Sequence, residues 1–149
     1  MKRLFTLSLL VLFSFGLNAQ RTIIHAGKLI DGKSDQVMTS MSIVIEGNKI
    51  VAVDQGYTKG RNDDQVIDLK NKTVMPGLMD MHVHIESQSS PSSQLNKYVM
   101  NEADLAYDAQ VYANRTLMAG FTTVRDLGGS GVNVALRKAI NAGKVVGPR

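Results

Sequence analysis

Two of the three histidines in this 149-residue chain, His82 and His84, stand one residue apart near the middle of the sequence. They follow Pro76-Gly77 in a stretch rich in strand-forming residues. Successive side chains of an extended strand point to opposite faces, so both imidazoles project from one face. Two neighbouring imidazoles backed by an apolar face suit a metal ion at the end of a buried strand. We therefore predict that both histidines bind metal; the alternative is two polar residues on a half-buried strand.

Two acidic residues lie close to this pair in the sequence. Asp80 falls on the same strand face, two residues before His82. Its carboxylate could support an imidazole N–H, or it could be a buried carboxylate paired with another charge, and the sequence leaves both open. Glu86 continues the face into the next loop. We expect a solvated loop residue there, with contact to the metal or the substrate as the alternative.

A second polar cluster, Arg125 and Asp126, ends a predicted strand over residues 121–124. The two side chains alternate in direction, so only one of them can point inward. We expect a local ion pair or a clamp on the following loop, with substrate contact as the alternative. The next loop, residues 128–131, is glycine-rich but lacks the lysine of a phosphate-binding loop, which favours a plain turn with Ser130 near the helix N-cap.

The elements that must position these residues fall into two patterns. Residues 20–75 alternate short strands with turns, including the two-residue hairpin Gly47-Asn48, and predict a small antiparallel sheet or half of a sandwich. Residues 76–149 instead alternate strand and helix. Two successive βα units predict an α/β fold with a parallel sheet. The expected strands are 78–85 and 121–124, and the expected helices are 95–118 and 132–142.

The N-terminus and the composition bear on the protein's cellular location and on its partners. Residues 1–19 combine Lys2-Arg3, an apolar run over 4–17 and Ala19 at a cleavage position, which predicts a signal peptide and an exported protein, periplasmic or secreted. The run is shorter than the about 20 residues of a membrane span, so no stable span is expected. The chain has no cysteine, which excludes disulfides and thiolate ligands. Its net charge is +4, and the basic residues are scattered along the sequence, which argues against nucleic acid as a partner.

Three segments then occur in a telling order: Gly27-Lys28-Leu29-Ile30-Asp31-Gly32, Pro76-Gly77-Leu78-Met79-Asp80-Met81-His82-Val83-His84, and Gly120-Phe121-Thr122-Thr123-Val124-Arg125-Asp126. With these segments the chain resembles the metal-dependent amidohydrolase superfamily. The Thr-Thr-Val-Arg-Asp stretch is most similar to the imidazolonepropionase and Xaa-Pro dipeptidase-like branch.

That resemblance implies a TIM-like (β/α)₈ barrel, preceded by strands of a small β-sandwich domain. It also implies one or two divalent metals, usually zinc, with His82 and His84 as ligands from the first barrel strand. The other ligands and the catalytic residues belong to later strands. Because such a barrel takes about 250 residues, we expect residues 76–149 to form its first two βα units only. The chain would then be an N-terminal fragment with an incomplete barrel, the catalytic residues beyond residue 149 and little activity alone.

The function predicted from these observations is hydrolysis of a C–N bond, amide or peptide, by metal-activated water. The expected substrate is a small molecule or short peptide, handled by an exported dipeptidase-type enzyme, and the complete protein could form homo-oligomers. One alternative keeps the chemistry and changes the substrate to a cyclic amide or imidazolone. The other is a non-enzymatic, secreted β-rich binding module in which the histidine pair is incidental.

Overall fold

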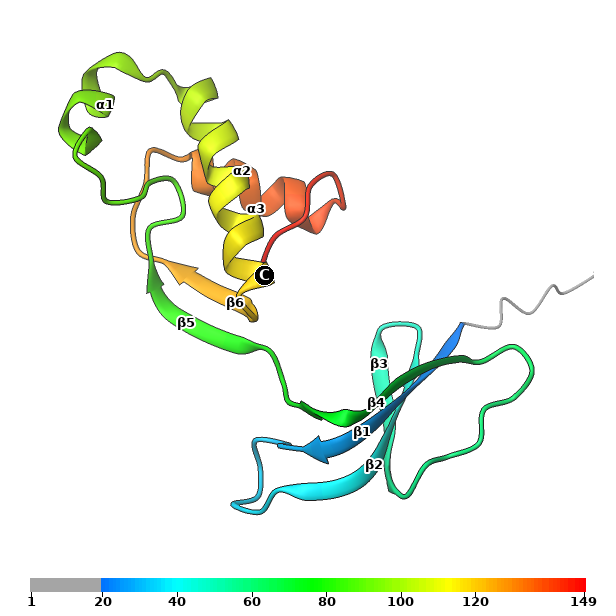
Figure 1. Cartoon of the computed structure of the whole chain (residues 1–149). Helices are drawn as coiled ribbons and strands as arrows, with labels where there is room; N and C mark the ends of the chain where they lie inside the picture. The colour runs from blue at the N-terminus through cyan, green and yellow to red at the C-terminus, as the bar shows by residue number, and fades with distance from the viewer. Residues whose placement is uncertain (1–19) are drawn as a thin grey trace, which may run out of the picture. The chain divides into compact units, whose positions relative to one another are not determined.

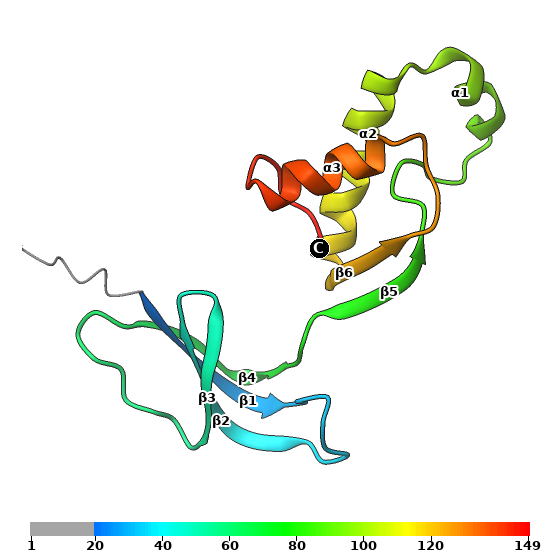
Figure 2. The same ribbon diagram turned by 180° about the vertical axis from the view of Figure 1, so that it is seen from behind.

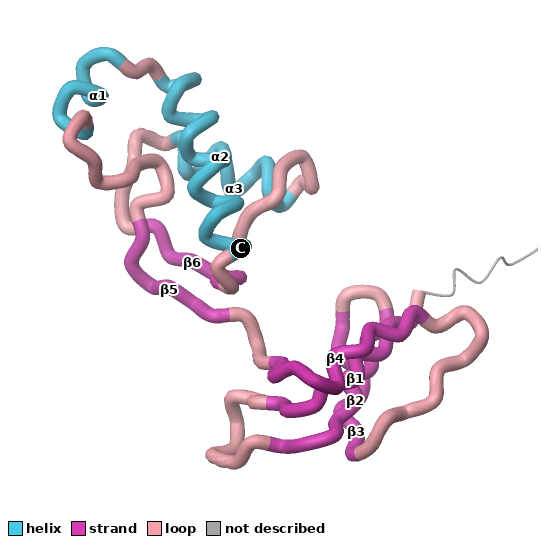
Figure 3. The backbone as a smooth tube through the Cα atoms, in the orientation of Figure 1, coloured by secondary structure: helices cyan, strands magenta, loops and turns pink. Residues whose placement is uncertain are grey.

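The computed structural model describes residues 20–149, so the predicted signal peptide lies outside the described residues. The chain divides between Met75 and Pro76 into two compact units, drawn in Figure 1. The first unit is all strand and loop, whereas the second mixes strands with helices, as the colouring of Figure 3 shows. Within residues 20–149, no helix is long and apolar enough to cross a membrane.

The first unit is a four-stranded sheet with the spatial order β3-β2-β1-β4. The hairpin predicted at Gly47-Asn48 is confirmed, because it joins β2 to β3 with Glu46 paired to Lys49. Gly47 has a φ of 61°, the left-handed conformation such a turn requires. The strands are β1 (Arg21–Leu29), β2 (Met38–Glu46), β3 (Lys49–Gln55) and β4 (Gln65–Val74).

The expectation of a purely antiparallel sheet was wrong at β4, which pairs in parallel with β1. The chain leaves β3 at one edge of the sheet and returns through residues 56–64 to the opposite edge, which a tight hairpin could not do. The pairing register also shifts at Gly27, which faces Lys70 to Lys72. A Cβ on Gly27 would lie 1.9 Å from the Lys70 carbonyl oxygen, so only glycine fits this bulge.

Both faces of this sheet are partly covered. One face gathers a small apolar core of Ala26, Leu29, Met41 and Ile43. On the other face the loop 56–64 crosses over the strands and is fixed by polar contacts. Ser42 Oγ donates to the Gly56 carbonyl at 2.8 Å, and the ring of His25 is 2.9 Å from the Thr58 carbonyl oxygen. His25 is therefore a structural residue of this sheet.

The second unit contains two strands, β5 (Leu78–Val83) and β6 (Phe121–Asp126), that pair in parallel, which confirms the predicted sheet type. Helices α2 (Glu102–Met118) and α3 (Val132–Asn141) lie on one side of these strands (Figure 1 and Figure 2). The core between them consists of Ile85, Ala109, Ala113 and Leu136. Ala109 and Ala113 lie one turn apart on α2, and their small side chains allow the helix to approach closely.

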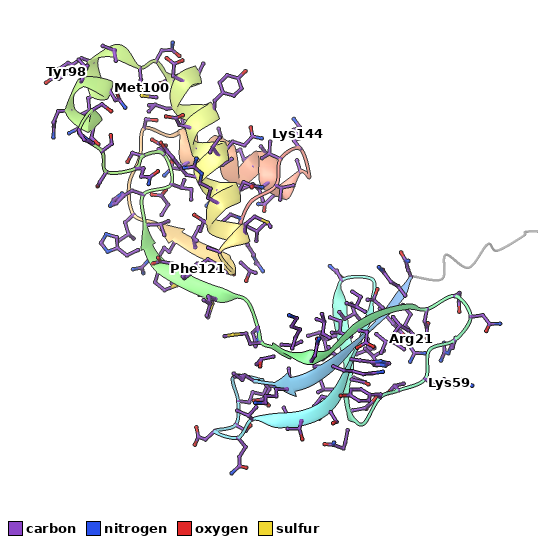
Figure 4. The ribbon with its side chains drawn as sticks, in the orientation of Figure 1. Arg21, Lys59, Tyr98, Met100, Phe121 and Lys144 are labelled. Atoms are coloured by element: carbon purple, nitrogen blue, oxygen red, sulfur yellow. The ribbon has the colours of Figure 1, made fainter. Side chains whose placement is uncertain are left out.

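The single helix expected over 95–118 is two helices, α1 (Ser93–Val99) and α2. The break falls at Met100, which is labelled in Figure 4 and has an extended backbone with ψ of 138°. Asn101 then caps α2: its side chain accepts from the Ala103 and Asp104 N–H groups, and Asp104 accepts from the Asn101 N–H. This reciprocal capping box satisfies N–H groups that a continuous helix would bond internally.

The C-terminal residues begin a further parallel pairing on the free side of β6. Arg149 N–H donates to the Thr122 carbonyl, and Val124 N–H donates to the Arg149 carbonyl, each at 2.8 Å. This is the bonding pattern of a parallel neighbour strand. Among the described residues the barrel is not closed, and β5 and β6 are its two barrel strands.

Candidate metal centre

His82 lies in β5, and His84 follows the last residue of that strand. The centroids of the two rings are 5.5 Å apart, with their planes at 71° to each other. Both side chains are exposed, whereas Ile85 on the opposite face is buried in the core. The alternation of the strand thus brings the imidazoles together at its carboxyl end, where active sites of parallel barrels are built.

A contact with the next βα loop fixes the ring of His84. Its Nδ1 lies 3.3 Å from the Gly128 carbonyl oxygen. A carbonyl oxygen only accepts hydrogen bonds, so Nδ1 is the donor in this contact and Nε2 is the nitrogen left to coordinate. Metal-binding histidines commonly donate their other ring N–H to a backbone carbonyl in this way. The ring is therefore prepared to bind a cation through Nε2.

Among residues 20–149, the hydrogen bond of Asp80 goes to backbone, not to an imidazole N–H or to another charge. Its Oδ1 accepts a hydrogen bond from the backbone N–H of His82 at 3.0 Å, and the residue is half-buried. This bond joins a side chain to the backbone two residues later, a local contact that Asp makes readily. Asp80 therefore braces the backbone of β5 at His82.

The expectation that Glu86 is solvated was wrong. Glu86 is 8% exposed, and its carboxylate accepts hydrogen bonds from Ser130 N–H at 2.7 Å and Asn133 N–H at 2.6 Å. These N–H groups belong to the start of α3, where a helix leaves donors unsatisfied and favours negative charge. The N-cap itself is Gly131, with φ of 109°, and Ser130 directly precedes it, near the N-cap as predicted. The anion that this glycine-rich loop cradles is the chain's own Glu86.

Asp126 connects the ends of both strands. Its Oδ2 accepts from Ile85 N–H and its Oδ1 from Gly128 N–H, each at 2.9 Å. Arg125 points elsewhere, because its Nε donates to the Met81 carbonyl at 2.9 Å. The ion pairs of residues 20–149 do not include an Arg125–Asp126 pair. Both residues contact backbone, Arg125 along β5 and Asp126 at the loops.

The donors present suit part of a metal site. The two imidazoles are adjacent. In His84 the hydrogen bond is made by Nδ1, which leaves Nε2 available to coordinate a metal. Within residues 20–149, however, His, Cys, Asp and Glu side chains form no cluster of three or more that could hold a cation. A catalytic zinc ion takes three protein ligands, so further ligands would have to come from other residues of the protein.

The fold and the histidine pair together define the class of protein. Residues 73–149 match the sequence profile of the Amidohydrolase family, so the chain belongs to that family. Its members and the relatives found here are hydrolases that act on C–N bonds. The resemblance predicted from the sequence is confirmed, as is the start of a TIM barrel.

Individual relatives refine this placement. A crystal structure of a Xaa-Pro dipeptidase with methionine in its active site is 46% identical, with a TM-score of 0.81 over 87% of this chain and 32% of that one. A prolidase complexed with N-methylphosphonate-L-proline is 31% identical, with a TM-score of 0.75 over 87% and 31%. A dihydroorotase of Streptococcus thermophilus is 32% identical over 102 residues, 68% of this chain and 20% of that protein. The chain therefore spans between a fifth and a third of these relatives.

Proposed function

We propose that this chain supplies the first two metal ligands of a divalent-metal hydrolase that cleaves C–N bonds. The observation that carries the proposal is the pairing of His82 and His84 at the carboxyl end of β5, with His84 Nε2 free to coordinate. Family membership supports the chemistry and favours it over the alternative of a secreted binding module. Zinc is the proposed ion, because neutral imidazole is one of its preferred ligands.

When bound, a divalent cation polarises the scissile carbonyl and lowers the pKa of a water molecule. The residues of this chain would hold and orient that cation. His82 and His84 provide the nitrogen ligands, and Gly128 keeps the second ring in the required tautomer. Asp80 and Asp126 brace the backbone on either side of the pair.

The proposed substrate is a dipeptide, with an imino acid at its C-terminal position. Support comes from the similarity to a Xaa-Pro dipeptidase and to a prolidase bound to a proline-containing phosphonate. The predicted signal peptide favours an exported enzyme, which would meet peptides outside the cytoplasm. The runner-up substrate is a cyclic amide, because the dihydroorotase similarity covers two thirds of this chain.

The test uses the full protein that contains these residues, expressed with its own N-terminus. We expect release of proline from Xaa-Pro dipeptides, loss of that release after chelation, and its return with Zn²⁺. His82→Ala and His84→Ala should each abolish turnover. His25→Gln is a matched control: it removes the third histidine but keeps a donor for the Thr58 carbonyl. We expect it to retain activity.

The results of these assays distinguish the dipeptide from the cyclic amide and test the metal role of the histidine pair. Turnover of dihydroorotate or a related cyclic amide without dipeptide cleavage would select the runner-up. Metal-independent activity, or unchanged activity in both histidine variants, would refute the metal role of the pair. Cell fractionation tests the proposed export, and recovery of uncleaved protein in the cytoplasm would contradict it.

A further inference from the structure

Asp126 is bonded to both sides of the His84 contact. One carboxylate oxygen accepts from the N–H of Ile85, the residue after His84, and the other accepts from the N–H of Gly128. The carbonyl of that same glycine faces the His84 ring. Three hydrogen bonds thus link the ring of His84 to Gly128, Gly128 to Asp126, and Asp126 to the backbone beside His84.

The loop that carries Gly128 needs contacts that fix its backbone. Residues 128–131 read Gly-Gly-Ser-Gly, and glycine permits many backbone conformations. Asp126 anchors the loop at Gly128 N–H, and Glu86 anchors it two residues later at Ser130 N–H. The Gly128 carbonyl lies between the two anchored amides. Its direction is therefore set by carboxylates that come from the ends of β6 and β5.

We propose that Asp126 is a positioning residue for His84: by holding Gly128, it fixes the tautomer and the direction of the imidazole. The inference rests on the proposed function, in which His84 is a metal ligand. Among the described residues, the hydrogen bonds of the Asp126 carboxylate go to the Ile85 and Gly128 amides, so it reaches His84 through the backbone. Its effect should therefore appear in metal affinity and ring tautomer rather than in the fold alone.

Asp126→Asn is the decisive variant, because an asparagine keeps the shape but can accept from only one of the two N–H groups through its oxygen. In the metal-free full protein we expect its Zn²⁺ affinity, measured by competition with a chromogenic chelator, to fall about 10–100-fold, the usual loss on removing such a partner. Asp104→Asn is the matched control. It also removes a carboxylate that accepts a backbone N–H in the same unit, at Asn101, but it has no link to His84. We expect it to lower the melting temperature and leave Zn²⁺ affinity unchanged.

The tautomer gives a second readout that requires no folded Asp126 variant. In ¹⁵N-histidine-labelled, metal-free protein, His84 should be protonated at Nδ1, with its signals assigned by their loss in His84→Ala. A predominantly Nε2-protonated His84 would overturn the inference. The inference would also be overturned if Asp126→Asn bound Zn²⁺ with the affinity of the unsubstituted protein while His84→Ala bound Zn²⁺ weakly. If neither His82→Ala nor His84→Ala weakens Zn²⁺ binding, the proposed function itself fails.

Discussion

Replacing Glu86 by glutamine should destabilise the second unit by about 2–3 kcal/mol. The carboxylate is 8% exposed and accepts two short backbone bonds, at 2.7 and 2.6 Å. A hydrogen bond to a charged group contributes about 1.5–3 kcal/mol. The glutamine oxygen can keep one bond, but its NH₂ group would face the other N–H and leave that donor unsatisfied. Loss of negative charge beside α3 adds about 0.3–1 kcal/mol.

Urea unfolding of the full protein, followed by circular dichroism, measures this loss as a lower midpoint at unchanged slope. Glu102→Gln is the matched control, because Glu102 also places a carboxylate at the start of a helix, here α2, but is exposed. It should cost only the charge effect, at most about 1 kcal/mol. A Glu86→Gln variant whose unfolding free energy matches that of Glu102→Gln would refute the assignment of Glu86 as the anchor of α3.

Two further substitutions test the fold. Gly27→Ala should destabilise the first sheet by about 1–3 kcal/mol or more, because its Cβ would meet the rigid Lys70 carbonyl; a urea midpoint equal to that of the unsubstituted protein would show that the bulge can rearrange. Asn101→Ala should cost about 1 kcal/mol by removing the N-cap of α2. Amide exchange at Ala103 and Asp104 measures that loss locally, and unaltered protection there would contradict the cap.

Local signals in the sequence were sufficient for part of the fold. Gly47-Asn48 specified its hairpin because a two-residue turn depends on adjacent residues only. The pairing of His82 with His84 followed from strand alternation, although their role as ligands stays a prediction. The break before α2 was also encoded locally, by the capping residues Asn101 and Asp104, although one helix was expected over residues 95–118.

Other features depend on partners distant in sequence. Glu86 looked like a solvated residue because its two N–H donors lie 44 and 47 residues away. Gly128 orients His84 across 44 residues, with no local pattern to reveal it. The parallel pairing of β4 with β1 likewise depends on where the chain returns after β3, which strand propensity does not determine.

The central claim is that His82 and His84 are two ligands of one divalent metal. Diffraction data from crystals of the Zn²⁺-loaded full protein, collected at the zinc absorption edge, test it most directly. The account predicts an anomalous peak within about 2.0–2.1 Å of a ring nitrogen of each histidine. For His84 that nitrogen should be Nε2. A zinc ion bound elsewhere, with both imidazoles turned away from it, would contradict the claim.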